Sequence, residues 1–378
     1  MFSYWEQESF FHYDYIVVGS GIVGLSVAIE LQERFPNKSV LILERGIFPT
    51  GASTKNAGFA CMGSLTELLD DAVHMPIEAV LQLFEDRKRG LEILRNRLGD
   101  EAIGYEDTGS YELIREEALP QLDALEEMNR LLFPINGKPT FSLAPEKIQS
   151  FGFNSNEVKT LVRSEVEGAL HTGKMMQQLL KLALSRGIML RTGTMVNQFE
   201  ESTSGVCLEV EGGTLSEQHT LRCNHLFICT NAFTRQLLPD VDVRPGRGQV
   251  LITEPIPQLP FKGIFHLEQG YYYFREIAGR VLFGGGRNLD FEGETTTAFE
   301  LNMHIQNELE EKLKRIILPS IPDIKIANRW AGIMAFGPHK RPIVDRFGER
   351  VFGVFRLGGM GVALGSLVAK QVVALNED

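Results

Sequence analysis

A glycine-rich turn between an apolar strand and a helix is the feature that most constrains how this chain can fold. Residues 15–18 form a short β-rich apolar run, and Gly19, Gly21 and Gly24 then lead into a helix-compatible stretch. In this spacing the first glycine permits a tight turn and the second lets backbone N–H groups approach a pyrophosphate, while the third lets the helix pack closely against the strand. The arrangement predicts a strand, a turn and a helix that bind a dinucleotide.

The residues that follow support this prediction. A second apolar run, residues 40–43, ends in Glu44 and Arg45. An acidic residue in this place can accept hydrogen bonds from the ribose hydroxyls of an adenosine. Next comes a turn of small and polar residues, 51–58, whose backbone can run close to a flat polar group. We expect its cofactor contacts to be Ser53, Thr54, Asn56, Ala57 and Gly58.

Size and charge limit the class of protein. The chain has 378 residues, 43% of them hydrophobic and 23% charged, which is enough for one large or two ordinary domains. A net charge of −11 without a basic block argues against a nucleic-acid partner. The four cysteines form no metal-like pair, and no apolar run reaches the ~18–20 residues of a membrane span. We therefore expect a cytoplasmic protein without a metal site or transmembrane segment, and a homo-oligomer stays compatible with the sequence.

Two long helical patterns interrupt the α/β rhythm, at residues 77–98 and at about 116–133. From residue 158 strand and helix signals alternate again. We read this as a second domain inserted into the first. The expected dinucleotide-binding domain is discontinuous, at residues 10–75, 150–235 and 337–378, and the expected inserted domain comprises residues 76–149 and 236–336.

Two further turns are candidates for cofactor contact. The apolar run 226–229 ends in Thr230, Asn231 and Ala232, which can lay backbone against the dinucleotide a second time. Near the C-terminus a glycine-rich turn opens a helix, and its free N–H groups and positive dipole end suit an electron-rich acceptor such as a flavin edge. An ordinary helix cap is the alternative. This second turn consists of Gly358, Gly359, Met360, Gly361 and Val362.

Taken together, these stretches resemble the D-amino-acid-oxidase-like family of FAD-dependent oxidoreductases, which holds glycine oxidase, sarcosine oxidase and D-amino-acid dehydrogenase. The resemblance rests on residues 17–24 with 44–46, 51–58, 168–173 with 230–232, and 330–361. It implies an α/β fold: a glutathione-reductase-type FAD-binding Rossmann domain with an inserted α+β substrate domain over the flavin. It also implies FAD contacts at Val196, on the adenine side, and at Gly332.

The chain departs from the family in three places. A histidine in the turn 53–56, or a cysteine after residues 330–332, tethers FAD in some relatives, and neither is present here. We therefore predict non-covalent FAD. Amino-acid-specific relatives often carry an arginine shortly after Gly332, where this chain has Ile333-Met334-Ala335. A lysine that sarcosine-oxidase-like relatives carry near the C-terminal turn is also missing.

Arg275 is the candidate replacement for the missing carboxylate contact. By the two-residue period of a strand, Tyr271, Tyr273 and Arg275 share one face. We expect these three residues to form the catalytic site, an aromatic box with one cation. Such a box suits an amine beside a carboxylate, because desolvation favours the neutral amine without a dedicated base. The alternative is that Arg275 pairs with surface acids such as Glu268 or Glu276.

The sequence and the resemblance predict an FAD-dependent amine or amino-acid oxidase or dehydrogenase. It would oxidise a C–N bond by hydride transfer to flavin N5, release an imine that hydrolyses in water, and pass electrons to oxygen or an electron carrier. Two alternatives stay open. A 2-hydroxy-acid dehydrogenase on the same fold would need a base such as His266. A flavin-bound assembly protein without turnover would fit the missing arginine after Gly332.

Overall fold

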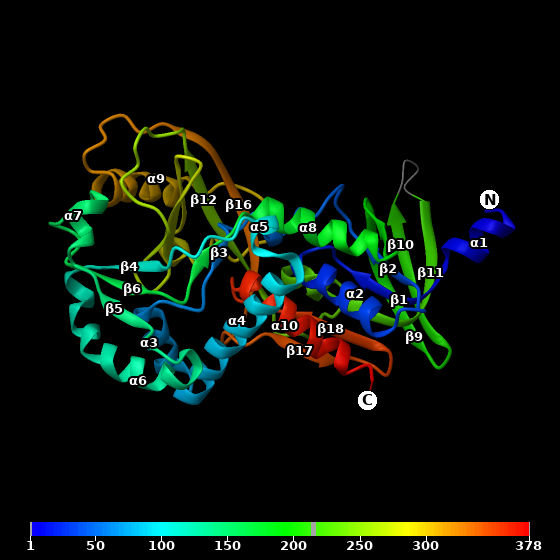
Figure 1. Ribbon diagram of the computed structural model, residues 1–378. Helices are drawn as coiled ribbons and strands as arrows, with labels where there is room; N and C mark the ends of the chain where they lie inside the picture. The colour runs from blue at the N-terminus through cyan, green and yellow to red at the C-terminus, as the bar shows by residue number, and fades with distance from the viewer. Residues whose placement is uncertain (1, 213–216, 378) are drawn as a thin grey trace.

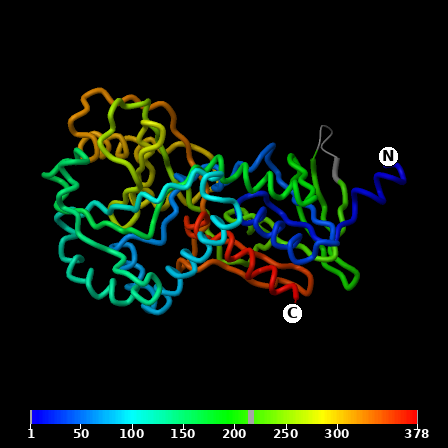
Figure 2. The backbone as a smooth tube through the Cα atoms, in the orientation of Figure 1, coloured from blue at the N-terminus to red at the C-terminus, as the bar shows by residue number. Residues whose placement is uncertain are grey.

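The computed structural model describes residues 2–212 and 217–377. Within these residues the chain forms two eight-stranded sheets and one two-stranded sheet. Figure 1 shows the two large sheets at opposite ends of an elongated molecule. The blue N-terminal, green central and red C-terminal parts of the chain gather at one end in Figure 2, so the first sheet is assembled from separated segments.

The first sheet has a parallel core, in which β1 pairs with β2 on one side and with β11 on the other. Strands β8 and β18 extend this core in parallel, and β17 closes one edge antiparallel. A meander of β9, β10 and β11 completes it. The bounds are β1 (His12–Val18), β2 (Val40–Leu43), β8 (Met189–Arg191), β9 (Thr194–Ser202), β10 (Gly205–Gly212), β11 (Glu217–Ile228), β17 (Ile343–Arg346) and β18 (Val351–Phe355).

Both faces of β1 are covered, because its side chains alternate between two apolar clusters. Tyr15 and Val17 pack with the helices α2 (Ile22–Arg34) and α10 (Gly361–Ala374), whereas Ile16 and Val18 pack with the meander. This is the arrangement expected of a parallel strand buried on both faces. It confirms the predicted α/β fold.

Helix α4 (Ile77–Leu98) lies against α10, so it belongs to the helix layer of the first sheet as much as to the inserted part. A Cβ on Gly90 would lie 2.1 Å from the carbonyl oxygen of Ala363, which shows how closely the two helices approach. The expected boundary at residue 76 therefore does not separate α4 from the first sheet. The apolar stripe of α4 predicted the helix, but it did not predict the surface on which the helix packs.

The second sheet is mostly antiparallel, in the order β16-β12-β15-β14-β13-β4-β6-β5. Helix α9 (Met303–Lys312), continued by a π-helical turn at Leu313–Ile317, packs on one face through Ile305 and Leu309. The bounds are β4 (Ser110–Ile114), β5 (Phe141–Leu143), β6 (Thr160–Ser164), β12 (Arg244–Thr253), β13 (Ile264–Leu267), β14 (Tyr272–Ile277), β15 (Arg280–Gly285) and β16 (Ile326–Phe336).

Strand β6 corrects the expected domain boundary at residue 150. We placed residues 158–164 in the dinucleotide-binding domain, but β6 pairs antiparallel with β4 and β5 in the second sheet. Its Leu161 is buried in the cluster that contains Tyr111 and Phe265. A short apolar run predicts a strand but does not say which sheet it joins.

A two-stranded sheet formed by β3 and β7 lies where the chain passes between the large sheets. The helix expected at 116–133 is a 3-10 stretch at Glu116–Ala124, which contains Pro120, followed by α6. Proline lacks the N–H that an α-helix interior requires, which explains the break. The remaining bounds are α1 (Tyr4–Phe10), β3 (Phe59–Ala60), α3 (Leu65–His74), α5 (Asp100–Ile103), α6 (Leu125–Asn136), α7 (Lys147–Phe151), β7 (Gly168–Ala169) and α8 (Thr172–Ser185), with 3-10 turns at Ala52–Thr54, Asn231–Gln236 and Arg287–Leu289.

None of the helices in the described part of the chain combines the length and apolarity needed to cross a bilayer.

Candidate active site

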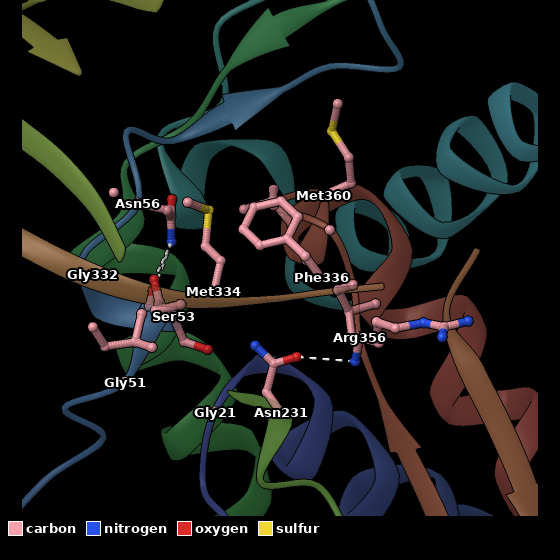
Figure 3. Close-up of a pocket in the computed structure, with 18 of the residues that line it drawn as sticks. Gly21, Gly51, Ser53, Asn56, Asn231, Gly332, Met334, Phe336, Arg356 and Met360 are labelled. Atoms are coloured by element: carbon pink, nitrogen blue, oxygen red, sulfur yellow. Dashed lines mark hydrogen bonds between the residues drawn. The ribbon is translucent and has the colours of Figure 1, made fainter. Parts of the chain in front are cut away.

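A cavity of about 570 Å³ lies between the two large sheets and takes its walls from both. This volume is in the range of small-molecule and cofactor sites, about 300–1,000 Å³. Figure 3 shows residues from distant parts of the chain around one open space, among them Ser53, Asn231, Met334 and Phe336. The cavity therefore joins the dinucleotide-type sheet to the inserted sheet.

The turn between β1 and α2 forms one wall, and its glycines are required by close backbone contacts. A Cβ on Gly19, whose φ is +102°, would lie 2.8 Å from the carbonyl oxygen of Cys229. A Cβ on Gly21 would lie 2.8 Å from Ser53 Oγ, and one on Gly24 would lie 1.9 Å from the carbonyl oxygen of Gly19. Gly19 and Gly21 line the cavity, whereas Gly24 lies outside it, between helix and strand. The N-terminus of α2 thus faces the cavity, as an anion site requires, with the N–H of Ile22 donating to Ser53 Oγ at 2.9 Å.

Glu44 is held rigidly at the end of β2. Its Oε2 accepts hydrogen bonds from the backbone N–H and the hydroxyl of Ser20, at 3.0 and 2.7 Å, and its Oε1 accepts one from the N–H of Gly46, at 2.8 Å. A carboxylate has about four acceptor positions. One position therefore remains for a ligand hydroxyl, in a side chain that lines the cavity.

The residues around Glu44 form an apolar and cationic end of the cavity. The guanidinium of Arg45 lies 3.7 Å from the centroid of the Phe233 ring, a cation–π distance. Burial lowers the pKa of Arg45. Val196 lines the same cavity, as do Thr230 and Asn231.

The turn 51–58 passes beneath strand β16. The indole N–H of Trp330 donates to the carbonyl oxygen of Lys55 at 2.9 Å, and a Cβ on Gly332 would lie 3.2 Å from the Cβ of Lys55. Asn56 shapes the turn, because its amide donates to the carbonyl oxygen of Ser53 and its Oδ1 accepts from the N–H of Gly58. Of the predicted contacts in this turn, Ser53, Asn56 and Ala57 line the cavity.

Three predicted contacts lie behind the cavity wall. The Thr54 hydroxyl donates to the carbonyl oxygen of Pro49 at 2.7 Å, and Gly58 packs against the carbonyl oxygen of Leu170. Ala232 is buried in a separate apolar cluster with Ile333. These residues support the backbone that lines the cavity and do not themselves line it.

The C-terminal glycine turn forms the part of the cavity wall next to β16, since the N–H of Gly358 donates to the carbonyl oxygen of Ala335 at 3.1 Å. Gly358 and Gly359 have positive φ values of 57° and 86°, and α10 begins at Gly361 without a side-chain cap on its first N–H groups. The cavity is lined by all five predicted residues of this turn, Gly358, Gly359, Met360, Gly361 and Val362. Asn231 Oδ1 accepts from the N–H of Arg356 at 3.1 Å, which ties the turn to the end of β11 (Figure 3).

Arg275 is not in the cavity, although Tyr271 and Tyr273 line it. Its side chain is buried, and its Nη1 donates to the carbonyl oxygens of Leu170, Gly58 and Ala57, at 2.8, 3.2 and 3.4 Å. The alternative, an ion pair with Glu268 or Glu276, is not found in the described chain either, and Arg275 Nε donates instead to the backbone carbonyl oxygen of Glu276 at 3.2 Å. The two-residue period gave the right face, but backbone carbonyls from neighbouring segments lie over that end of the strand.

Several cavity residues were missed by the sequence reasoning. Lys340 Nζ lies 2.9 Å from Glu67 Oε1 and 2.7 Å from Asp71 Oδ1, and all three residues line the cavity. Burial raises the pKa of Asp71, whereas for Glu67 the effect of burial is outweighed by Lys340 and Arg87, which lower its pKa. No local motif links residue 340 to the helix α3, so the sequence carried no signal for this group.

His266 also lines the cavity, and it is backed by an acid. Its Nε2 lies 3.5 Å from Oε2 of the buried Glu167. Burial opposes the charged imidazole, but Glu167 outweighs burial and raises the pKa of His266. Arg287 is a further cavity residue that the sequence reasoning passed over. Its signal was the three glycines that precede it at the end of a strand.

Comparison with known proteins agrees with this geometry. The family model for FAD dependent oxidoreductases, DAO, matches residues 14–375. The bifunctional protein ThiO/ThiG of Trichormus variabilis is 23% identical over 337 residues, which are 88% of this chain and 47% of that protein. This chain therefore spans about half the length of that relative. The probable oxidoreductase OrdL of Haemophilus influenzae is 21% identical over an alignment of 402 residues, covering 97% of this chain and 84% of OrdL.

Among solved structures, glycine oxidase from Geobacillus kaustophilus has the same fold, with a TM-score of 0.77 at 21% identity, covering 97% of this chain and 95% of that one. The glycine turns, Glu44 and the N-termini of α2 and α10, which face the cavity, fit FAD as its ligand. Because the family match spans nearly the whole sequence, this chain belongs to the DAO family of FAD-dependent oxidoreductases.

Proposed function

We propose that this protein oxidises a C–N bond in an amine or an amino acid. The observation that carries the proposal is the continuation of the cavity past Gly332 into a chamber walled by Tyr271, Tyr273 and Phe336. This chamber adjoins the C-terminal glycine turn through Met360. A small substrate in it would lie between the inserted sheet and the end of the site that suits a flavin.

Different residues of the cavity suit the different parts of FAD. Glu44 and Val196 suit the adenosine, the N-terminus of α2 suits the pyrophosphate, and the N-terminus of α10 suits the flavin edge. Bound FAD would supply the hydride acceptor, flavin N5. The absence of a histidine at residues 53–56 supports non-covalent binding.

The chamber favours the reactive form of the substrate. Aromatic and thioether side chains from Phe59, Tyr273, Met334 and Met360 line it, and desolvation by such apolar surroundings lowers the pKa of a substrate ammonium group. The neutral amine then has the lone pair that must assist hydride loss from the adjacent carbon. Burial raises the pKa of Tyr273 to about 12, so its phenol stays protonated and can donate a hydrogen bond.

The products follow from the balance of the reaction. Loss of a hydride from the carbon and of a proton from nitrogen leaves an imine, which hydrolyses to a carbonyl compound once it is in water. The two electrons pass to oxygen or to an electron carrier. The name of one relative, 4-methylaminobutanoate oxidase, and the glycine oxidase fold support an amine or amino acid as substrate.

Anaerobic reduction of the purified holoprotein tests this function. A panel of amines, amino acids and the matching 2-hydroxy acids is added separately, and the visible absorption band of the flavin is followed. We expect amines or amino acids to bleach the band and the matched hydroxy acids to leave it unchanged. If nothing in the panel bleaches the band, a flavin-bound assembly role without turnover is favoured instead.

A 2-hydroxy-acid dehydrogenase is the second candidate, and the position of His266 favours it. His266 lines the chamber with Glu167 behind it, an arrangement that suits a base for a substrate hydroxyl. Bleaching by hydroxy acids that is lost in His266→Gln would support this candidate. Bleaching by amines that survives the same substitution would exclude it, because a neutral amine needs no such base.

A further inference from the structure

Arg287 lines the cavity from the 3-10 turn that follows strand β15. The sequence alone did not suggest an arginine in the substrate chamber at this place. We propose that Arg287 binds the carboxylate of the substrate and so selects an amino acid over a simple amine. The inference deepens the proposed function and rests on it for the chemistry of the reaction. The inference is supported by the position and contacts of the Arg287 side chain and by the partners that already bind Lys340 and Arg356.

Two aromatic rings hold the guanidinium in place. Its Cζ lies 4.2 Å from the ring centroid of Phe336 and 5.2 Å from that of Phe291. Contacts of this kind orient a guanidinium through its face and leave its N–H groups unused. The Nε of Arg287 is buried and has no hydrogen-bond partner in the described chain. The buried Nε is out of a ligand's reach, but the two Nη groups are not among the buried unpartnered atoms and make no hydrogen bond within the described chain, so they are free to donate to an acceptor in the cavity.

The charge of Arg287 is not cancelled by a nearby acid. Glu294 acts on it electrostatically, but the carboxylate of Glu294 is bound by Arg247 at 2.7 and 3.0 Å and by Gln249 at 3.0 Å. Burial lowers the pKa of Arg287. The ordinary pKa of arginine lies so far above neutral pH that the guanidinium nevertheless stays charged. An anion is therefore the natural complement.

The backbone before Arg287 brings it to the chamber. Strand β15 ends in glycines with positive φ, +123° at Gly285 and +79° at Gly286, and a Cβ on Gly285 would lie 2.0 Å from the carbonyl oxygen of Tyr271. On the neighbouring strand a Cβ on Gly246 would lie 3.0 Å from Arg287 Cζ and 2.3 Å from the Phe336 ring. Glycine at these places leaves the space that the guanidinium and the ring occupy.

The site lies on the side of the chamber that faces the C-terminal turn. Met334 and Phe336 are on the same face of β16, and the sulfur of Met334 lies 3.5 Å from where a Cβ on Gly359 would be. Figure 3 shows both side chains extending into the same open space. A carboxylate on Arg287 would thus place the α-carbon of an amino acid toward the turn that suits the flavin edge.

Two other cations that line the cavity, Lys340 and Arg356, are already engaged, and Lys55 Nζ lies over the Phe299 ring, 5.4 Å from its centroid. Lys340 is bound by Glu67 and Asp71. Arg356 donates to the carbonyl oxygens of Arg341 and Asp242, and its side chain runs away from the open space in Figure 3. Arg287 is therefore the better-placed partner for a planar carboxylate, whose two oxygens match the guanidinium fork.

Ligand binding to the holoprotein tests the inference without requiring turnover. Benzoate and its neutral counterpart benzamide are titrated against wild type, Arg287→Gln, Arg287→Lys and Arg280→Gln, and the difference spectrum of the flavin reports occupancy. Arg280→Gln is the matched control, because Arg280 begins strand β15, which leads to Arg287, and donates to the carbonyl oxygen of Thr253 outside the cavity. FAD content is measured for each variant.

We expect Arg287→Gln to weaken benzoate binding by about tenfold or more and to leave benzamide binding unchanged, because one charge-assisted contact is lost. Arg287→Lys should fall between wild type and Arg287→Gln, and Arg280→Gln should match wild type. Equal benzoate affinity in Arg287→Gln and wild type, a parallel loss of benzamide, or no benzoate binding by wild type would overturn the inference. Loss of benzoate alone in a protein whose flavin no amine reduces would sustain the site and refute the proposed function.

Discussion

At the scale of single residues, Arg275 shows how a buried arginine can organise backbone without entering the cavity. One Nη1 atom is shared among three carbonyl oxygens, from residues 57, 58 and 170, of which that of Gly58 also accepts from the N–H of Leu170 at 2.8 Å. A charged donor in such a place contributes about 1.5–3 kcal/mol, because its loss leaves buried acceptors unsatisfied. The residue is thus expected to act on stability.

We predict that Arg275→Met lowers the free energy of unfolding by about 2–3 kcal/mol and leaves the KM for an amino-acid substrate within about twofold of wild type. Urea denaturation of the FAD-loaded protein measures the first quantity, and steady-state kinetics of the folded fraction measures the second. Arg280→Met, on the adjacent strand, is the control. A large rise in KM without loss of stability would return Arg275 to the substrate site.

His266 and Glu167 form a buried pair whose contribution to stability depends on pH. Burial disfavours both charges, but each partner favours the charge of the other, so the pKa of His266 is raised and that of Glu167 is lowered. For His266 the stabilisation is fully present below its unfolded pKa, about 6.5, and is lost as pH rises through the raised folded value. For Glu167 it is present above about pH 4.5 and is lost as pH falls through the lowered folded value.

The melting temperature of His266→Gln should therefore lie furthest below that of wild type in mildly acidic solution, and the difference should shrink as pH rises. Thermal unfolding of both proteins from about pH 5 to about pH 9 measures it. His304→Gln, which changes an exposed histidine on α9, should show no such trend. A difference that grows with rising pH would mean that the imidazole is neutral in the folded protein.

At the scale of elements, the sequence predicted features that depend on short local motifs and failed for features that depend on contacts between distant segments. The β1–α2 turn could be predicted because its three glycines form a short local motif, even though Gly19 and Gly21 meet atoms of Cys229 and Ser53, which are distant in sequence. Strand β6 was assigned to the wrong sheet because its partners, β4 and β5, are chosen by apolar contacts across the inserted part. Local periodicity carries no record of such a choice.

The candidate site divides in the same way. Backbone contacts to the dinucleotide depend on short motifs, so most of the predicted residues line the cavity. Side chains of the substrate chamber depend on which loop covers which strand end. That is why Arg275 was expected there and Arg287 was not. The three glycines before Arg287 signalled a turn, but not the direction in which the next side chain would leave it.

The contact between α4 and α10 makes a prediction at this scale. Gly90 permits it, since a Cβ there would lie 2.1 Å from the carbonyl oxygen of Ala363, in the first turn of α10. Gly90→Ala should gain about 1 kcal/mol of helix propensity and lose more through displacement of α10. The net effect expected is a loss of about 1–3 kcal/mol in unfolding free energy, together with weaker FAD binding.

Denaturation and FAD titration of the apoprotein measure these two effects. Gly51→Ala is a control for stability alone, because a Cβ at Gly51 would meet no atom within 4 Å and its backbone is extended. Unchanged FAD affinity in a destabilised Gly90→Ala protein would separate the helix contact from the cofactor site. A more stable variant would show that α10 moves without cost.

At the scale of the whole molecule, the cavity joins the two large sheets, and one apolar cluster also contains residues of both, among them Val17 of β1 and Val162 of β6. The cavity walls come from the first sheet, from the turn 51–58 and from strand β16 of the second sheet. A ligand that fills this space contacts both sheets and stabilises the folded state by an amount that grows with the logarithm of its concentration, about 2.7 kcal/mol at a hundredfold excess over Kd. FAD should therefore order segments of both sheets.

Hydrogen exchange of holoprotein and apoprotein provides the measurement. We expect removal of FAD to increase amide exchange in residues 19–24, 51–58 and 356–363 and also in β16, because backbone from all four lines the cavity. The meander strand β10 contributes no residue to the cavity lining, whereas its neighbour β9 contributes Thr194 and Val196. Amides of β10 should therefore exchange at the same rate in both forms. Exchange that changes only in the first sheet would show that FAD is bound without the inserted sheet, and the substrate chamber would then have no fixed position relative to the flavin.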